Sequence, residues 1–257
     1  MLNIVRSDIY RMRKSKLFYG VIAVAGFIAF LLMMLNRQDI RLGISVFGNL
    51  TTFISVEDIV RLGIEYQKGL GIIVAVFISV FIGREYQWNT WQHKWLISKS
   101  RLSMYISKML LSMFTSAMVF LLFEIIVLVC SGQISYLLMS DYVVTVLCGC
   151  AIYAALGAVL SLFSMLIKSN VAAIVVSMGY VLFSETLVTV IQNASNLSEI
   201  TSKIAGWYYQ HSIYGMSSIL CNTAITTSSI TSIVLTSLAI VVISALIGMA
   251  FFRKYEL

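Results

Sequence analysis

The stretch MLLSMFTSAMVFLLFEIIVLVC, residues 109–130, holds one charged residue, Glu124, within a long apolar run. A helix needs about 20 mostly apolar residues to cross the hydrocarbon core of a bilayer. Because lipid offers the backbone no hydrogen-bond partners, such a run must satisfy its own N–H and C=O groups, and a helix does so. This stretch therefore predicts a membrane-spanning helix.

Five further runs have the same character: residues 17–35, 68–83, 142–167, 171–191 and 230–252. The run at 68–83 is the shortest, and it crosses only if Lys68 and Arg84 extend toward opposite headgroup layers. With 60% hydrophobic and 11% charged residues, the chain cannot cover the surface of a soluble globule. The predicted fold class is all-α integral membrane, with six transmembrane helices in a single domain over residues 1–257.

Basic residues predict the orientation, because Lys and Arg are retained on the cytoplasmic side of a membrane. If both termini are cytoplasmic, only five of the 18 basic residues lie outside: Arg37, Arg41, Arg61, Lys68 and Lys203. The net charge of +7 then lies mainly on the cytoplasmic face. Membrane lipids are the expected partners of this charge, and nucleic acid is not, because no soluble domain carries a basic patch.

Shorter elements are predicted outside the spans. An interfacial helix is predicted over residues 2–14, because one helical face gathers Leu2, Val5, Ile9 and Met12. In the outer loop 36–67, the capping pattern Ser55-Val-Glu-Asp58 predicts a short helix over residues 59–67. In the outer loop 193–229, residues 207–211 predict an aromatic belt. A disulfide between Cys130 and Cys221 is conceivable, and no metal-binding spacing is present.

The stretch GREYQWNTWQHKWLISKSR, residues 83–101, is polar and basic although it connects two spans. The spacing of Trp88, Trp91 and Trp95 predicts one face of a short cytoplasmic helix over residues 85–97. Glu85 is expected in its first turn, where the helix dipole favours a carboxylate. On the residues alone two roles stay open: the indoles anchor the connection at the headgroups, or they dock into a groove of a cytoplasmic partner.

The cytoplasmic signature of ABC-2-type ABC transporter permeases resembles four segments of this chain: Glu85-Tyr86, Thr90, Leu96-Ile-Ser-Lys-Ser-Arg101 and Tyr105-Ile-Ser-Lys108. The family's basic helix before the first span is similar to residues 7–15, whereas Asn89 stands where the family usually has Gly. The resemblance implies that residues 85–97 are a coupling helix that receives force from an ATPase. Its ATPase-coupling residues would be Glu85, Tyr86, Trp88, Thr90, Trp91 and Trp95.

The ATPase is expected to be a separate subunit that binds ATP and Mg²⁺, because the sequence has no phosphate-binding Gly-x-x-x-x-Gly-Lys-Ser/Thr motif. This chain is expected to hold no cofactor and to be no enzyme, since neither His93 nor His211 lies at membrane depth beside a catalytic partner. Six spans are half of the family's usual set, which implies a homodimer with two ATPase copies.

The cargo is suggested by a narrower resemblance. Small permeases of lantibiotic immunity and of phenol-soluble-modulin export in Gram-positive bacteria are similar to this chain in size and layout. The resemblance implies a bacterial cytoplasmic membrane and the export of amphipathic membrane-active peptides. The alternatives are an exporter of drugs, lipids or ions with the same architecture, and a membrane sensor subunit that transports nothing.

Polar side chains inside the spans are the candidate lining of a substrate path. Glu124 and Glu185 are the acids within apolar segments, where a carboxylate is costly enough to indicate a function. Both lie toward the outer ends of their spans, where water is expected to reach them. Ser112, Thr115 and Ser116 form a polar stripe on the same helix as Glu124. The alternative role of all five is hydrogen bonding within the bundle, or contact with the headgroups.

Overall fold

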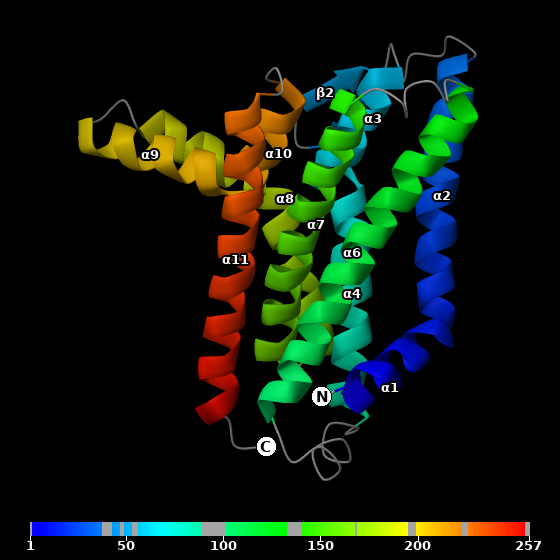
Figure 1. Ribbon diagram of the computed structural model, residues 1–257, viewed down its shortest axis with the longest axis vertical. Helices are drawn as coiled ribbons and strands as arrows, with labels where there is room; N and C mark the ends of the chain where they lie inside the picture. Colours follow the sequence, from blue (N-terminus) through cyan, green and yellow to red (C-terminus); the bar gives the residue numbers. More distant parts are fainter. Residues whose placement is uncertain are drawn as a thin grey trace.

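Six long helices run side by side in the computed structural model (Figure 1). The structure describes residues 2–37, 43–46, 49–52, 56–88, 101–132, 140–167, 169–194, 199–222 and 226–254. The long helices are α2 (Lys16–Arg37), α4 (Leu70–Gln87), α6 (Arg101–Ser131), α7 (Ser140–Leu166), α8 (Asn170–Ala194) and α11 (Thr227–Lys254). Each is long and apolar enough to cross a membrane, which confirms the six predicted spans and the all-α membrane class.

The largest differences from the predicted bounds are in α4 and α6. Helix α4 begins at Leu70 and continues to Gln87, and α6 begins at Arg101 rather than near residue 109. Lys68 lies outside the span, in the 3₁₀ helix η1 (Tyr66–Lys68), where its ammonium group pairs with the Glu65 carboxylate at 2.5 Å. The hydropathy pattern underestimated the length of both helices, in each case at the end where their charged residues pair with one another.

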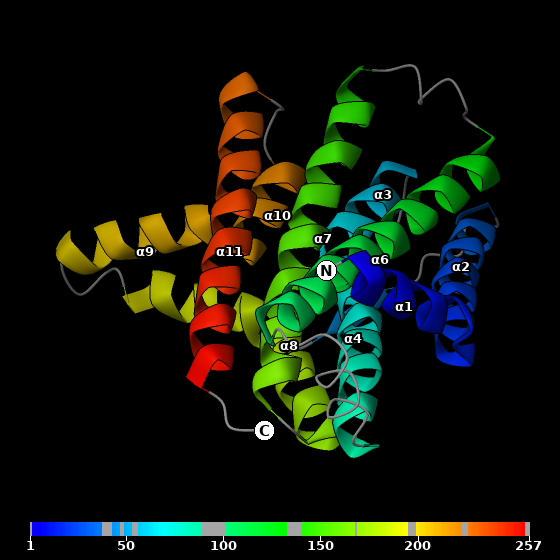
Figure 2. The ribbon, with the colours of Figure 1, turned by 60° about the horizontal axis from the view of Figure 1, so that its bottom comes forward.

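Helix α1 (Leu2–Arg13) lies across one end of the bundle, against α6, as Figure 2 shows. Helices α4, α7 and α11 end on this side, and we call it the terminal face. Helix α1 covers the predicted helix at residues 2–14 to within one residue, but its apolar face was predicted correctly only in part. Met12 is buried as predicted, but Asp8 is buried as well and Ile9 is 40% exposed, because Asp8 and Arg11 find charged partners inside the bundle.

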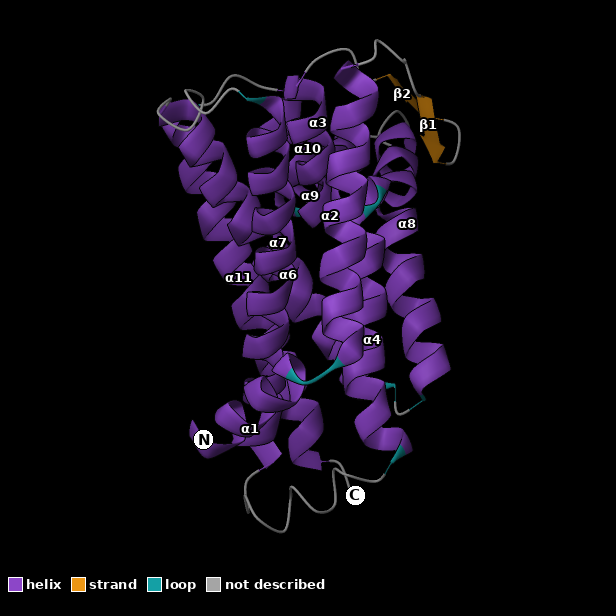
Figure 3. Cartoon of the chain, turned by 90° about the vertical axis from the view of Figure 1, so that its right-hand side faces the viewer, coloured by secondary structure: helices purple, strands orange, loops and turns teal. Residues whose placement is uncertain are grey.

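The opposite end, which we call the far face, carries the short elements between α2 and α4 (Figure 3). Strands β1 (Gly43–Val46) and β2 (Asn49–Thr52) form an antiparallel hairpin that the sequence analysis did not predict. Helix α3 (Val56–Ile64) follows and begins three residues before the predicted outer helix. It carries Glu57 and Asp58 in its first turn, where carboxylates stabilise a helix, and buries Ile59 and Ile64.

Between α8 and α11 lie two further helices, α9 (Glu199–His211) and α10 (Ile213–Asn222). Helix α10 packs against α7, whereas α9 projects from the bundle beside α8 (Figure 1). The Trp207 ring is 63% exposed and stacks on His211 with ring centroids 4.8 Å apart. All four cysteines are free thiols, so Cys130 and Cys221 do not form a disulfide, and the Cys221 thiol faces the Arg61 carbonyl instead.

The centre of the bundle is the contact between α6 and α7, while α2, α8 and α11 keep more of their surface exposed. Phe120 of α6 stacks on Tyr153 of α7 with ring centroids 4.7 Å apart. Gly157 brings the two helices into close approach, because a Cβ at this position would lie 2.6 Å from the backbone oxygen of Ser112. Small residues at such contacts let helix backbones pack closely in lipid.

Candidate functional site

The last turn of α4 departs most from the sequence prediction. Glu85 was expected to begin a separate coupling helix, but α4 continues through it to Gln87, and the Trp88 N–H bonds to the Arg84 carbonyl. Glu85 therefore lies at the C-terminal end of a helix, where the dipole disfavours a carboxylate. The prediction placed it in the first turn of a new helix and was wrong, because it did not include the cations that neutralise Glu85 in the fold.

Those cations come from two other helices. Lys108 of α6 directs its Nζ to the Glu85 Oε1, at 2.5 Å, and to the Asp8 Oδ1 of α1, at 2.8 Å. Arg11 of α1 pairs with the same Glu85 oxygen. The Ser107 hydroxyl donates to the other Asp8 oxygen at 3.1 Å. We call Asp8, Arg11, Glu85, Ser107 and Lys108 the charge network.

The charge network is removed from solvent. Lys108 is 2% exposed and Asp8 and Glu85 no more than 1%, while Arg11 is half-buried at the edge. Two acids and two bases balance their charges, which is the condition under which ionised groups are tolerated in a low-dielectric interior. Removing one partner would leave an uncompensated buried charge. The three helices are therefore held in one arrangement by this network.

Phe81, one turn before Glu85 on α4, covers the network on one side. Its ring centroid lies 4.4 Å from the Arg11 guanidinium carbon and 5.0 Å from the Lys108 Nζ. Arg11 also donates a hydrogen bond to the Phe81 carbonyl at 3.2 Å. A cation over an aromatic face is attracted by the ring quadrupole, and this attraction grows when water is excluded. The ring thus both shields the charges and fixes α1 on α4.

The charge network borders both ends of the connection between α4 and α6. Tyr86 follows Glu85 and donates a hydrogen bond to the Met165 carbonyl of α7 at 3.0 Å, so the end of α4 is also attached to α7. Trp88 ends the helix with 67% of its surface exposed. The remaining coupling positions, Thr90, Trp91 and Trp95, lie outside the described residues. The last turn of α4, which leads into this connection, is therefore fixed to three other helices, α1, α6 and α7.

Asp8 and Arg11 were missed as site residues. The sequence pattern is that of a basic surface helix, whereas the pairing joins positions that lie 99 residues apart in the chain, as for Ser107 and Asp8. Helical periodicity relates residues on neighbouring turns, so it cannot indicate a contact between positions this far apart in the chain. One local signal was present, because Asp8 is the single acid in an otherwise basic segment, residues 1–16.

The polar stripe of α6 lies inside the contact with α7. The Ser116 hydroxyl donates to the Tyr153 carbonyl at 2.6 Å, and the Thr115 hydroxyl donates to the Leu111 carbonyl at 2.9 Å. Ser112 is buried beside them. In this conformation the three candidate path residues contribute to helix packing, and none lies on an open surface.

Glu124 and Glu185 occupy different surroundings. Glu124 is 1% exposed, accepts a hydrogen bond from the Tyr142 hydroxyl at 3.2 Å and lies beneath Gly63 of α3. The expectation that water reaches this carboxylate is wrong in this conformation, because α3 covers it. Glu185 is half-buried and hydrogen-bonded to Tyr214 of α10. Burial and the nearby Glu185 carboxylate raise the pKa of Tyr214, so this hydroxyl stays protonated.

Neither a metal site among the described residues nor a curated relative assists the assignment. Over the described ranges, no group of three His, Cys, Asp or Glu residues is arranged to hold a metal ion. A search of curated proteins returned no match.

The comparison with protein families gives a match that includes the whole charge network. The model described as ABC-2 family transporter protein matches residues 4–184, more than half of the chain. The matched region runs from α1 into α8 and contains the α4–α6 connection. With six membrane-spanning helices and this match, the chain belongs to the ABC-2 family of transporter membrane proteins and is a permease subunit of an ABC transporter.

Proposed function

We propose that this permease is driven by a separate ATPase subunit that binds the connection after α4, over the predicted coupling helix 85–97. The observation that carries the proposal is the charge network, because it fixes α1, α4 and α6 to one another beside that connection. A force applied to residues 89–100 would reach the last turn of α4 and the first turns of α6. ATP and Mg²⁺ would be held by the ATPase, and the present chain would supply no catalytic residue.

The burial of the network makes such transmission efficient. Separating a buried ion pair costs several kcal/mol, typically about 3–5, when one partner is left alone. A movement that keeps Lys108 between Asp8 and Glu85 avoids this cost, so α1, α4 and α6 would move together as a rigid body. We infer that ATP-driven closure of the ATPases displaces this unit and changes access to a path between protomers.

The assembly we propose is a homodimer with two ATPase copies. Closed two-fold symmetry is the commonest arrangement of identical subunits, and it would give each ATPase one coupling helix. In this arrangement both termini and the charge network face the cytoplasm of a bacterial cell. The asymmetric distribution of Lys and Arg supports this orientation.

The proposed cargo is an amphipathic, membrane-active peptide, and the proposed direction is export. The resemblance to permeases of lantibiotic immunity and phenol-soluble-modulin export supports this choice. Glu124 and Glu185 supply buried or half-buried carboxylates toward the far face, which suits a cationic cargo once α3 or α10 moves. Drugs, lipids and ions are the competing cargoes, and a sensor role without transport is the competing function.

The test is to purify the permease with its co-purifying chains and reconstitute the complex in proteoliposomes. We expect ATP hydrolysis to be stimulated by amphipathic peptides and to drive their transport. Trp91→Ala with Trp95→Ala should preserve membrane insertion while separating ATP hydrolysis from transport. Trp207→Ala, an exposed tryptophan on α9, is the matched control and should leave the coupling intact.

Three results would contradict the proposal. Transport without an ATPase would exclude the mechanism, and unchanged coupling in the double tryptophan variant would return the connection to membrane anchoring. ATP hydrolysis that responds to no peptide, drug, lipid or ion would favour the sensor function.

A further inference from the structure

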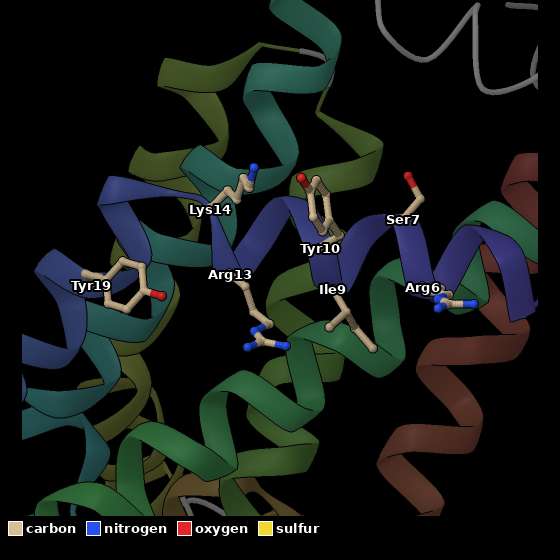
Figure 4. A pocket seen from close by; sticks show the side chains of 7 residues that line it. All are labelled: Arg6, Ser7, Ile9, Tyr10, Arg13, Lys14 and Tyr19. Atoms are coloured by element: carbon tan, nitrogen blue, oxygen red, sulfur yellow. The ribbon is translucent and has the colours of Figure 1, made fainter.

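The outward side of α1 lines a pocket that contains no residue of the charge network. Together with the first residues of α2, it forms a shallow pocket of about 790 Å³, shown in Figure 4 and lined by Arg6, Ser7, Ile9, Tyr10, Arg13, Lys14 and Tyr19. Three of these seven residues are cations and none is an acid. The pocket therefore has a strongly positive lining on the terminal face of the bundle.

The charged residues of α1 lie on two sides of the helix, one facing the bundle and one facing the pocket. Asp8 and Arg11 face the bundle and take part in the charge network. Arg6, Arg13 and Lys14 face the pocket, and within the described ranges none of these three pairs with a carboxylate. Lys14 lies over the Tyr10 ring, with its Nζ 4.9 Å from the ring centroid. The pocket cations are thus available to an external anion.

An apolar stripe on α2 begins at this pocket. Tyr19, at the pocket edge, is 58% exposed, and four residues recur above it at helical spacing on the same exposed side: Ala23, Phe27, Leu31 and Met34. Phe27 is 63% exposed and Met34 49% exposed. A membrane-spanning helix presents such a stripe to lipid tails, so the positive pocket and an apolar track adjoin each other.

We propose that the pocket binds the headgroup of one anionic phospholipid, whose acyl chains lie along the α2 stripe. The guanidinium groups of Arg6 and Arg13 can each donate two parallel hydrogen bonds to a phosphate, and Lys14 adds a compact charge. Tyr10 and Tyr19 are amphipathic rings of the kind that reside at the headgroup level. A water-soluble phosphate would use the cations but not the stripe, so the geometry favours a lipid.

A lipid bound at this site would also stabilise the position of α1 on the bundle. Helix α1 lies between the lipid and the charge network, so a bound headgroup holds α1 from outside while Lys108 and Glu85 hold it from inside. The pocket shares no residue with the proposed ATPase contact at residues 85–97. Its test is therefore a binding measurement that does not depend on transport.

The experiment is native mass spectrometry of the purified protein with phosphatidylglycerol, compared with phosphatidylcholine of identical acyl chains. Each basic residue near a membrane surface strengthens anionic-lipid binding by about fivefold. The variant Arg6→Gln/Arg13→Gln/Lys14→Gln should therefore bind phosphatidylglycerol at least about tenfold more weakly, with screening allowed for. The matched control, Lys16→Gln/Arg61→Gln/Arg84→Gln, removes the same charge from exposed positions outside the pocket lining and should stay within about twofold of wild type.

Two additional arms use the unmodified protein. Added salt should release phosphatidylglycerol, and glycerol 1-phosphate, which carries at least the headgroup's negative charge but no tails, should fail to displace it at equal concentration. Equal binding of phosphatidylcholine would overturn the proposal, as would equal weakening in the control variant. Displacement by glycerol 1-phosphate would show that the stripe is not used and would also overturn it.

Discussion

Lys108→Met tests whether the charge network holds the terminal face together. Met is similar in length to Lys and apolar, so it fills the same buried space without the ammonium group. Asp8 keeps its hydrogen bond from Ser107, and Glu85 keeps Arg11, but neither carboxylate keeps the cation between them. We expect a large loss of stability with correct membrane insertion, because insertion depends on the apolar spans.

The magnitude follows from the distances. At 2.8 Å, an ammonium and a carboxylate attract each other by about 6 kcal/mol at an effective dielectric constant of about 20. Part of this attraction is offset by the desolvation of Lys108, which the variant no longer requires. The expected net loss is therefore the roughly 3–5 kcal/mol typical of a broken buried pair, which lowers the folded-to-unfolded ratio by a factor of about 150 to 4,000.

The assay is reversible unfolding in mixed micelles, followed by far-UV circular dichroism at increasing SDS. Lys16→Met is the matched control, because Lys16 is an exposed cation at the start of α2 and its loss should cost less than about 0.5 kcal/mol. Asp8→Asn combined with Lys108→Met leaves Glu85 with Arg11 and no charge unpaired. This double variant should recover about 2 kcal/mol or more of the sum of the single losses.

The reasoning would be refuted by either of two results. Lys108→Met could prove no more destabilising than Lys16→Met, or the double variant could lose as much as the two single variants together. The first would mean that the ammonium contributes no net stability, and the second that Asp8 and Lys108 act independently.

Three further variants examine other contacts. Gly157→Ala should destabilise the bundle by about 1–3 kcal/mol in the same unfolding assay, because the added Cβ meets α6, whereas Gly179→Ala, with nothing within 4 Å, should be neutral or slightly stabilising. Tyr86→Phe should cost about 1 kcal/mol through the lost hydrogen bond to α7, and an unchanged unfolding midpoint would show that this contact contributes nothing. Glu124→Gln should leave stability nearly unchanged, because the amide has a similar shape and its oxygen can still accept the hydrogen bond from Tyr142, while lowering transport of a cationic peptide in proteoliposomes; equal transport would remove Glu124 from the substrate path.

The six spans could be predicted because the signal is local and repeated. Runs such as residues 109–130 are uniform in hydropathy over the length that a bilayer requires, so few alternatives compete. The end of α4 could not be predicted in this way. Arg84 and Glu85 end the apolar run, so a hydropathy profile ends the helix there. In the fold Glu85 is buried and pairs with cations of α1 and α6, and the helix continues past it.

The candidate site was also predicted only in part, because contacts between helices that are distant in the chain leave no local signal. Glu85 was identified as a site residue through the family resemblance, whereas Lys108 was named only in the motif that carries that resemblance. The pairing of both with Asp8 and Arg11 depends on how α1 crosses the bundle. The hydroxyl groups of Ser112, Thr115 and Ser116 read as a polar stripe in sequence, yet Gly157 allows α7 to approach and cover that stripe. Which face of a helix is covered by a neighbour is a property of the packed bundle, and the sequence pattern gives only the stripe itself.

The separation between α1 and its partners also sets an order of events during synthesis. Ser107, which bonds to Asp8, leaves the ribosome 99 residues after it, and Lys108 follows one residue later. Until the third span emerges, Asp8 lacks the Lys108 ammonium group, and the first helix can use only the contacts of Arg11 with α4. A chain truncated before Lys108 keeps two complete hydrophobic spans and the contacts of Arg11 with α4, but it leaves the Asp8 carboxylate without its ammonium partner.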